Sequence, residues 1–196
     1  TILYGLPKGL EKRGRDMITK EDKSGNFPKS LLVALCTKHI VYYTDEIPKK
    51  NHKSKTDDFA TYIGGPAANA AITYAALGGD ATLAICLGMG PESEAIMKEL
   101  ETYGVKVLNF AAYETTPNTA CILVSKDGSR SIISGQHPFT PNRSFATDVY
   151  DFILFDCNQQ EISQDILAHS TGQTIVLDAG SVKPGIEAFL QKADIV

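Results

Sequence analysis

The most informative stretch of this sequence reads Gly64-Gly65-Pro66-Ala67-Ala68-Asn69-Ala70-Ala71. Its proline, the run of small residues up to Leu77 and the closing Gly78-Gly79 predict a helix over residues 67–77. Two glycines ahead of a helix let a ligand approach the backbone, and the free amides of the first turn favour oxygen-rich ligands. Asn69 can both donate to and accept from the hydroxyls of a polyol. The same residues also fit a plain alanine-rich helix in which Asn69 is a local cap.

The flanking sequence predicts an α/β fold with a mostly parallel sheet flanked by helices. Short continuous apolar runs are typical of strands buried on both faces, and segments with helical periodicity separate them. A further strand is expected to begin within residues 193–196. The expected strands of the sheet are 31–35, 81–87, 105–110, 152–155 and 175–177, and the other expected helices are 91–103, 162–169 and 182–192.

Other strand-like segments fall outside this alternation and predict a small β-rich lid. They are residues 40–43, 59–63, 119–125 and 130–134, and the last two form a hairpin around Lys126-Asp127-Gly128-Ser129. The lid is therefore expected to come from about residues 40–63 and 110–135. Residues 1–29 show no sustained period and are interpreted as a polar, basic extension of the domain formed by residues 30–196.

With these elements placed, the stretch around Gly64 resembles the first signature of the ribokinase-like (PfkB) carbohydrate kinase family. That signature has two glycines, a small residue, an asparagine, another small residue and two later glycines at fixed spacing. The resemblance covers roughly residues 30–196 and implies a ribokinase-like fold. The positions that match the signature are Gly64, Gly65, Ala67, Asn69, Ala71, Gly78 and Gly88.

The resemblance implies ATP-dependent phosphorylation of a sugar hydroxyl, with a ketose-like or sulfonated sugar as the substrate. Gly65 and Asn69 match positions that hold sugar hydroxyls, and Gly64 belongs to the same glycine pair. Asp156 or Asn158, at the end of a core strand, matches a further substrate contact. Polar residues that are simply solvated at a strand end would explain this last pair equally well.

One position departs from the family pattern. Relatives usually carry an aspartate nine residues before the lid proline, and counting back from Pro48 gives His39. A histidine can donate to a hydroxyl or, when charged, meet an anionic substituent, whereas a carboxylate only accepts. His39 is thus a candidate substrate-binding residue, although a structural role among its apolar neighbours explains it as well.

The larger departure concerns the catalytic motifs. The family carries an Asn-x-x-Glu motif for magnesium phosphate and a Gly-Ala-Gly-Asp motif with the catalytic base and anion hole, and both are expected beyond Val196. The resemblance therefore implies ATP and Mg²⁺ as cofactors but identifies no catalytic or cofactor-binding residue within this chain. Phosphoryl transfer depends on positioning and electrostatic stabilisation. We expect this chain to be the sugar-binding half of a kinase, truncated at its C-terminus and unable to turn over alone.

Two alternative functions remain open from the sequence. One is a nucleoside kinase of the same superfamily, and the other is a catalytically inactive sugar-binding or regulatory module, which His39 in place of the usual aspartate would favour. The expected partner is a sugar substrate. A homodimer through the lid is expected by analogy with the family alone.

Composition, net charge and residue spacing argue against several classes of protein and of binding site. The chain has 196 residues, of which 43% are hydrophobic, enough for one sizeable core. A net charge of −4 argues against a nucleic-acid partner, and the longest apolar run is far below the roughly 18 residues that a membrane span needs. No secretory signal opens the chain, so a cytoplasmic location is expected. The histidines show no metal-ligand spacing, and the cysteines are expected to be buried reduced thiols: Cys36, Cys86, Cys121 and Cys157.

Overall fold

A computed structural model describes residues 27–111, 116–135 and 147–196. Residues 1–26 of the expected basic extension lie outside these ranges, as do residues 112–115 of the expected lid. The fold begins slightly earlier than the sequence predicts. Lys29 is the first residue of the first strand, and Phe27 packs edge-on against Tyr74 with 6.2 Å between ring centroids.

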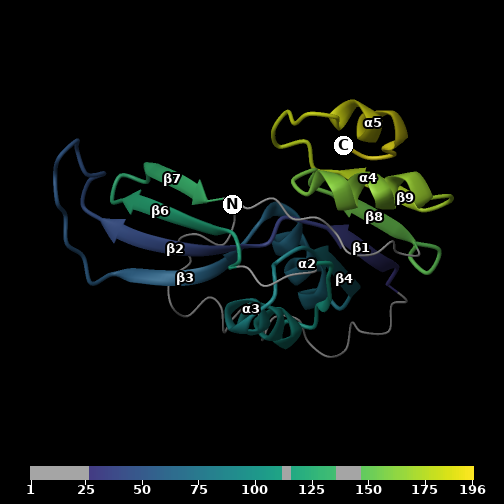
Figure 1. Cartoon of the computed structure of the whole chain (residues 1–196), viewed down its shortest axis with the longest axis horizontal. Helices are drawn as coiled ribbons and strands as arrows, with labels where there is room; N and C mark the ends of the chain where they lie inside the picture. The colour runs from purple at the N-terminus through teal and green to yellow at the C-terminus, as the bar shows by residue number, and fades with distance from the viewer. Residues whose placement is uncertain (1–26, 112–115, 136–146) are drawn as a thin grey trace.

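Five parallel strands form the central sheet, here called sheet A (Figure 1). Their order is β5-β4-β1-β8-β9, and every neighbouring pair is parallel. The chain therefore passes from the central strand β1 to one side of the sheet and later crosses to the other. The strands are β1 (Lys29–Val33), β4 (Asp80–Ile85), β5 (Lys106–Asn109), β8 (Phe152–Phe155) and β9 (Thr174–Leu177).

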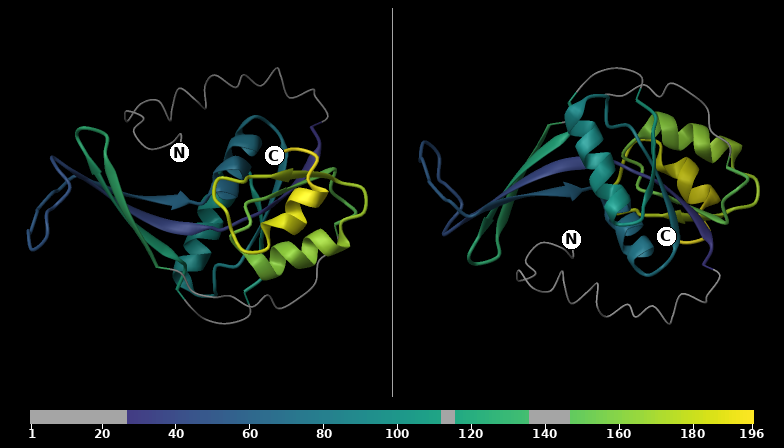
Figure 2. Two further views of the ribbon diagram at one scale, coloured as in Figure 1. Left: turned by 90° about the horizontal axis from the view of Figure 1, so that it is seen from above. Right: turned by 90° about the horizontal axis from the view of Figure 1, so that it is seen from below.

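Helices cover both faces of sheet A, as Figures 1 and 2 show. One face carries α2 (Pro66–Ala76) and α3 (Pro91–Thr102), and the other carries α4 (Gln160–His169) and α5 (Ile186–Lys192). Leu31 and Val33 of β1 lie in the core with α4 and α5, whereas Leu32 lies in the core with α2 and α3. Strand β1 thus contributes side chains to one hydrophobic core on each face of sheet A, which explains why it is apolar at consecutive positions. The predicted α/β class is confirmed.

The last part of the chain differs in detail from the expectation. Helix α5 begins at Ile186 rather than near residue 182, because Gly185 has a left-handed φ of 78° that a continuing helix does not allow. Residues 193–196 contribute one parallel bridge, Val176 to Ile195, instead of a full strand. The backbone N–H of Leu177 donates to the Ile195 carbonyl at 2.9 Å.

A second sheet, sheet B, projects from one end of sheet A (Figure 1). It contains β2 (Thr37–Thr44), β3 (Phe59–Gly64), β6 (Thr119–Ser125) and β7 (Arg130–Gly135) in the order β3-β2-β6-β7. The pair β2–β6 is parallel and the other pairs are antiparallel. Only Ala34, Leu35 and Cys36 separate β1 from β2, so sheet B starts directly at the carboxyl edge of sheet A.

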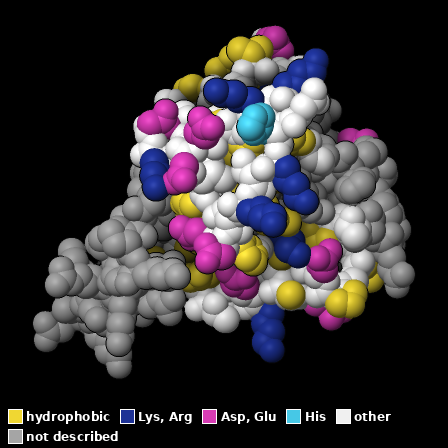
Figure 3. Space-filling view, turned by 90° about the vertical axis from the view of Figure 1, so that its left-hand side faces the viewer, with side chains coloured by type: hydrophobic (Ala, Val, Ile, Leu, Met, Phe, Trp, Pro, Cys, Tyr) yellow, Lys and Arg dark blue, Asp and Glu magenta, His cyan; other side chains and the backbone are white. Residues whose placement is uncertain are grey.

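The far end of sheet B carries the long connection between β2 and β3. Its side chains are mostly exposed and include both signs of charge. Figure 3, which views the molecule from this end, shows basic and acidic side chains interspersed, with apolar ones between them. The charged residues of the connection are Asp45, Glu46, Lys49, Lys50, Lys53, Lys55, Asp57 and Asp58.

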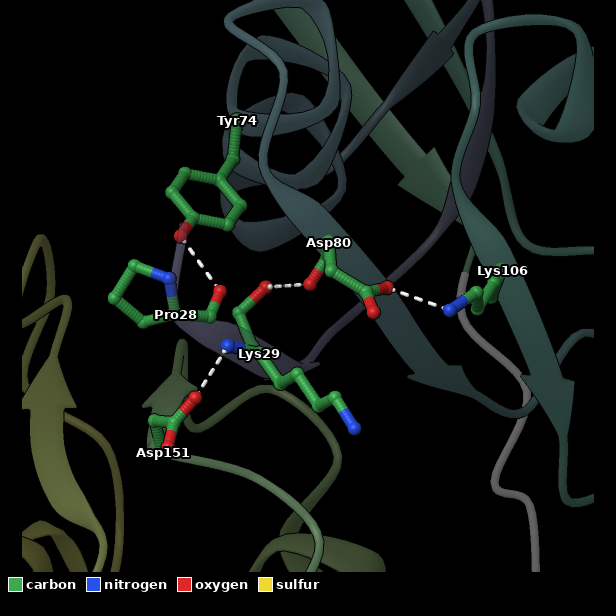
Figure 4. A network of polar contacts seen from close by, with 7 residues as sticks. Pro28, Lys29, Tyr74, Asp80, Lys106 and Asp151 are labelled. Atoms are coloured by element: carbon green, nitrogen blue, oxygen red, sulfur yellow. Dashed lines mark hydrogen bonds and ion pairs between the residues drawn. The ribbon is translucent and has the colours of Figure 1, made fainter. Parts of the chain in front are cut away.

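A polar network fixes the amino-terminal edge of sheet A, opposite sheet B (Figure 4). The backbone N–H of Lys29 donates to the Asp151 carboxylate at 2.6 Å, and the hydroxyl of Tyr74 donates to the Pro28 carbonyl at 2.7 Å. The ammonium of Lys106 pairs with the Asp80 carboxylate at 2.7 Å. The first two contacts fix the start of β1 to the segment before β8 and to α2, and the third joins β5 to β4.

Candidate functional site

The parallel strands of sheet A present all their carboxyl ends at one edge, next to sheet B. Strand β1 lies at the point where the chain reverses the direction in which it adds strands, with β4 on one side and β8 on the other. In open α/β sheets, ligands bind in the crevice outside the carboxyl ends of the strands at such a switch point. The candidate residues from the sequence follow β1, β3 and β8 at this edge.

The glycine pair forms the corner between β3 and α2. Gly65 is the N-cap of α2 with a φ of 121°, a conformation that favours glycine. A Cβ there would lie 2.9 Å from the carbonyl carbon of Leu35 and closer still to its oxygen. Gly65 therefore lets the start of α2 lie directly against the segment that leaves β1.

Asn69 lies in the first turn of α2 and is half-buried. Its backbone N–H donates to the Gly65 carbonyl at 3.0 Å, so the residue is part of the helix rather than its cap. The N-cap position of α2 is Gly65, which removes the local-cap interpretation of Asn69. Its amide retains donor and acceptor capacity at the predicted position.

Asp156 directly follows β8 and is only 1% exposed. Its carboxylate binds backbone N–H groups of the segments that form the corner. One carboxylate oxygen accepts from the N–H of Leu35 at 3.1 Å and the other from the N–H of Asn158 at 3.0 Å. The N–H of Ala67, in the first turn of α2, also donates to this carboxylate. Burial raises the pKa of Asp156, and these hydrogen bonds oppose the increase. The expectation of wholly free first-turn amides is thus wrong for Ala67.

Asn158 joins the site through Asp156 and lies half-buried beyond it. Between them, Cys157 adopts a left-handed φ of 53°, which turns the chain sharply at the end of β8. The ammonium of Lys183, from the loop after β9, donates to the Asp156 carbonyl at 2.9 Å. The loops after β8 and β9 are thereby fixed to each other.

His39 lies on β2 at the junction between the two sheets. Its partner across the strands is Tyr62, and Gly64 is the next residue of β3 on the same face. The imidazole occupies the space that a Cβ at Gly64 would fill, so this glycine makes room for the histidine. Burial lowers the pKa of His39, which keeps the ring neutral near pH 7.

Two amide side chains that sequence reasoning missed shape the rest of the edge. Gln159 makes both hydrogen bonds to the backbone of Cys86, at 2.9 and 3.2 Å. Asn109 accepts from the N–H of Leu87 at 3.1 Å and donates to the Gly88 carbonyl at 2.8 Å. Their positions, after β8 and at the end of β5, could have indicated that they lie at this edge of the sheet. Their hydrogen-bond partners could not be predicted, because those partners lie far away in the sequence.

Neither the thiols nor the acidic residues of the described ranges suggest other chemistry. Burial raises the pKa of Cys36 to about 12 and those of Cys86 and Cys157 to about 11, so these thiols are poor nucleophiles. In those ranges, no three His, Cys, Asp or Glu side chains are grouped as metal ligands. Nor does any described helix have the length and apolar character to cross a membrane.

Comparison with known proteins agrees with this geometry. The model of the pfkB carbohydrate kinase family matches residues 28–148. Among solved structures, the chain is similar to a candidate ribokinase from Agrobacterium tumefaciens, with 21% identity and a TM-score of 0.72. It is also similar to the ribokinase of Arabidopsis thaliana, solved with ribose and ATP, at 18% identity and a TM-score of 0.59. A nucleoside kinase from Methanocaldococcus jannaschii matches at 15% identity with a TM-score of 0.62.

These structures confirm the predicted ribokinase-like fold. They align with 85%, 86% and 87% of this chain, respectively. The chain spans only 56%, 59% and 61% of their own lengths. The likeness therefore concerns the part of that fold that contains sheet B and the first strands of sheet A.

Proposed function

This chain belongs to the pfkB family of carbohydrate kinases, and we propose that it supplies the sugar-binding half of an ATP-dependent sugar kinase. The observation that carries the proposal is the corner formed by Gly64, Gly65 and Asn69 at the switch point of sheet A. A sugar there would lie between the start of α2 and the face of sheet B that carries His39. Its hydroxyls would meet the amide of Asn69 and the imidazole of His39.

Each residue has a stated role in this proposal. Gly65 gives the ligand access to the backbone, Asn69 donates to one hydroxyl and accepts from another, and Asn158 contributes an amide at the end of β8. Asp156 acts as a positioning residue, because its carboxylate is occupied by backbone amides and is buried. Holding the sugar in one orientation is this chain's contribution to phosphoryl transfer.

ATP and Mg²⁺ enter the proposal through the family. When bound, the metal ion neutralises charge on the transferring phosphoryl group. We assign neither group to a residue of this chain, and we assign no catalytic base. We also propose a cytoplasmic location, a compartment that supplies ATP.

Two other functions are distinguished by experiment. The likeness to an archaeal nucleoside kinase favours a nucleoside as the second candidate substrate, and an inactive sugar-binding module is the third possibility. The test uses the natural protein that contains this chain, which is incubated with ATP, Mg²⁺ and a panel of ketoses, aldoses and nucleosides, and phosphorylated products are detected by mass spectrometry.

Formation of a sugar phosphate supports the proposal, and formation of a nucleoside monophosphate supports the second candidate. Binding of a sugar in calorimetry, unaffected by ATP and without product, indicates the binding module. Failure of the protein to bind or phosphorylate any sugar would overturn the proposal.

We further propose that two copies associate through sheet B. Three large apolar side chains of this sheet are exposed, Phe59 by 59%, Ile132 by 51% and Ile133 by 76%. Phe59 lies on the edge strand β3 and the two isoleucines lie on the opposite edge strand β7, so each edge of the sheet offers apolar surface to a second copy. The partner named here, a second copy, comes from the family resemblance.

A further inference from the structure

Lys183 lies in the loop after β9 and reaches the carboxyl edge of sheet A. Its ammonium group donates to the backbone carbonyl of Asp156 at 2.9 Å, and Asp156 directly follows β8. The ammonium is therefore held at the ends of two neighbouring parallel strands, an edge where open α/β sheets bind ligands. The carboxylate of the same Asp156 receives the N–H of Ala67 in the first turn of α2. One residue thus joins Lys183 to the corner that we propose as the sugar site.

The positive charge of Lys183 is half-buried and has no carboxylate partner among the described residues. Of the lysines in residues 27–111, 116–135 and 147–196, only Lys38 and Lys183 are half-buried. Lys38 pairs with the Glu92 carboxylate at 2.8 Å, whereas Lys183 forms none of the ion pairs found in those ranges. A charge that is taken partly out of water without a counter-ion costs free energy. An anion bound beside Lys183 would remove part of that cost.

Two acidic side chains follow the same strands but do not neutralise Lys183. The buried carboxylate of Asp156 accepts hydrogen bonds from backbone N–H groups, which occupy both of its oxygens. Asp178, directly after β9, is exposed, and its carboxylate accepts from the N–H of Gly180 at 3.0 Å. An ammonium group has three donors, and the carbonyl of Asp156 uses one of them. Lys183 therefore has both the charge and the free donors to bind a ligand.

We propose that Lys183 binds an oxyanion at the ends of β8 and β9, beside the sugar site. This inference rests on the proposed function, because it assumes that the neighbouring corner holds the sugar. An ammonium group binds phosphate and sulfonate oxygens through its charge and its N–H donors. Two sources share that chemistry: the phosphoryl group that a sugar kinase transfers, and a sulfonate carried by the sugar itself.

The test is isothermal titration calorimetry of the natural protein that contains this chain. Inorganic phosphate is the probe for a transferred phosphoryl group, and sulfoquinovose is the probe for a sulfonated sugar. The neutral probes are D-fructose, D-ribose and D-glucose, and glucose differs from sulfoquinovose mainly at the carbon that carries the sulfonate.

The variants separate the charge of Lys183 from its structural contact. Lys183→Gln removes the charge but keeps a donor for the Asp156 carbonyl, Lys183→Met removes both, and Lys183→Arg keeps both. Lys192→Gln is the matched control, because the Lys192 ammonium also donates to a backbone carbonyl, that of Leu167 at 3.0 Å. Thermal unfolding of each variant separates lost binding from lost folding.

We expect the native protein to bind at least one of the two anionic probes. Lys183→Gln and Lys183→Met should each weaken that binding about tenfold, because a charge-assisted hydrogen bond is lost. Lys183→Arg and Lys192→Gln should change it less than about threefold, since both keep a charge at position 183. Binding of a neutral sugar should stay the same in Lys183→Gln.

Two further readouts define the role and the ligand. Added salt should weaken binding of the anionic probe to the native protein more than to Lys183→Gln, a difference that a purely structural lysine would not produce. A loss confined to phosphate supports the transferred phosphoryl group as the source of the oxyanion, and a loss confined to sulfoquinovose supports the sulfonated sugar.

The outcomes that overturn the inference differ from those that overturn the proposed function. If the native protein binds a neutral sugar but neither anionic probe, or if Lys183→Gln binds each anionic probe as tightly as the native protein does, only the oxyanion site fails. Phosphate binding that depends on Lys183, in a protein that binds no sugar, would support the oxyanion site and overturn the sugar site. If the native protein binds none of the probes, both fail.

Discussion

Gly65 shows how a single residue decides whether the corner of the site can form. Its φ of 121° places the start of α2 against Leu35, at a distance where a methyl group has no room. Neither the conformation nor the contact tolerates a larger residue. The glycine is thus required by the packing of the chain, and the ligand contact that we propose for it would be an additional role.

We predict that Gly65→Ala lowers the free energy of unfolding by more than Gly90→Ala does. Gly90 is the matched control, because it caps α3 with a φ of 135° but has open space around its Cα. Both variants strain the backbone by about 1–3 kcal/mol, and only Gly65→Ala adds a collision. Urea unfolding followed by circular dichroism measures the difference, and equal losses would show that the contact with Leu35 is unimportant.

The cysteines provide a second prediction at the residue scale. With a pKa of about 11, Cys86 and Cys157 are only about one part in a thousand thiolate at pH 8, and Cys36, near 12, still less. Cys121 is only half-buried. Iodoacetamide should therefore alkylate Cys121 of the folded protein first, as peptide mass spectrometry would show. Faster labelling of Cys36 than of Cys121 would contradict the burial described above.

At the scale of elements, Asp156 joins segments that lie far apart in the sequence. Its carboxylate receives backbone N–H groups from the loop after β1, from α2 and from its own turn. The candidate site therefore depends on a buried carboxylate that backbone N–H groups occupy. Position at a strand end indicated Asp156, but its burial follows from packing that the sequence does not reveal.

Asp156→Ala should destabilise the protein by roughly 2–4 kcal/mol, because it leaves buried N–H groups of Leu35 and Asn158 without acceptors. Asp178→Ala is the control, since Asp178 follows the adjacent strand β9 but is exposed, and its carboxylate accepts from the nearby N–H of Gly180. Chemical denaturation of both variants measures the contrast. A loss for Asp156→Ala no larger than for Asp178→Ala would rule out the organising role.

The sequence predicted the elements better than it predicted their contacts. The helix after Gly65, the strand around Leu32 and the hairpin at Asp127 follow from local patterns, and the structure confirms each of them. The pairings made by Gln159 and Asn109 depend on the order of strands in space, which periodicity does not encode. For the same reason, the contact of His39 with Gly64 could not be read from their spacing.

At the scale of the whole molecule, sheet B projects from one end of sheet A (Figure 1) and leaves large apolar side chains exposed. If two copies associate there, the chain should run as a dimer in size-exclusion chromatography with light scattering. Ile133→Asp should convert it to a monomer of 21.2 kDa, because the substitution buries a charge in the interface. Val182→Asp, on an exposed residue of the β9–α5 loop, should leave the dimer intact. A monomeric native chain would contradict the proposed interface.

The claim on which the whole account depends is that the corner at the start of α2 binds a sugar. The most direct measurement is calorimetric titration of the native chain and of Asn69→Ala with the tightest-binding sugar, with Gln191→Ala, an exposed amide on α5, as the control. The account predicts a loss of roughly 1–3 kcal/mol for Asn69→Ala, a rise in Kd of about fivefold to more than a hundredfold, and no change for Gln191→Ala. The same affinity in Asn69→Ala as in the native chain would contradict the account.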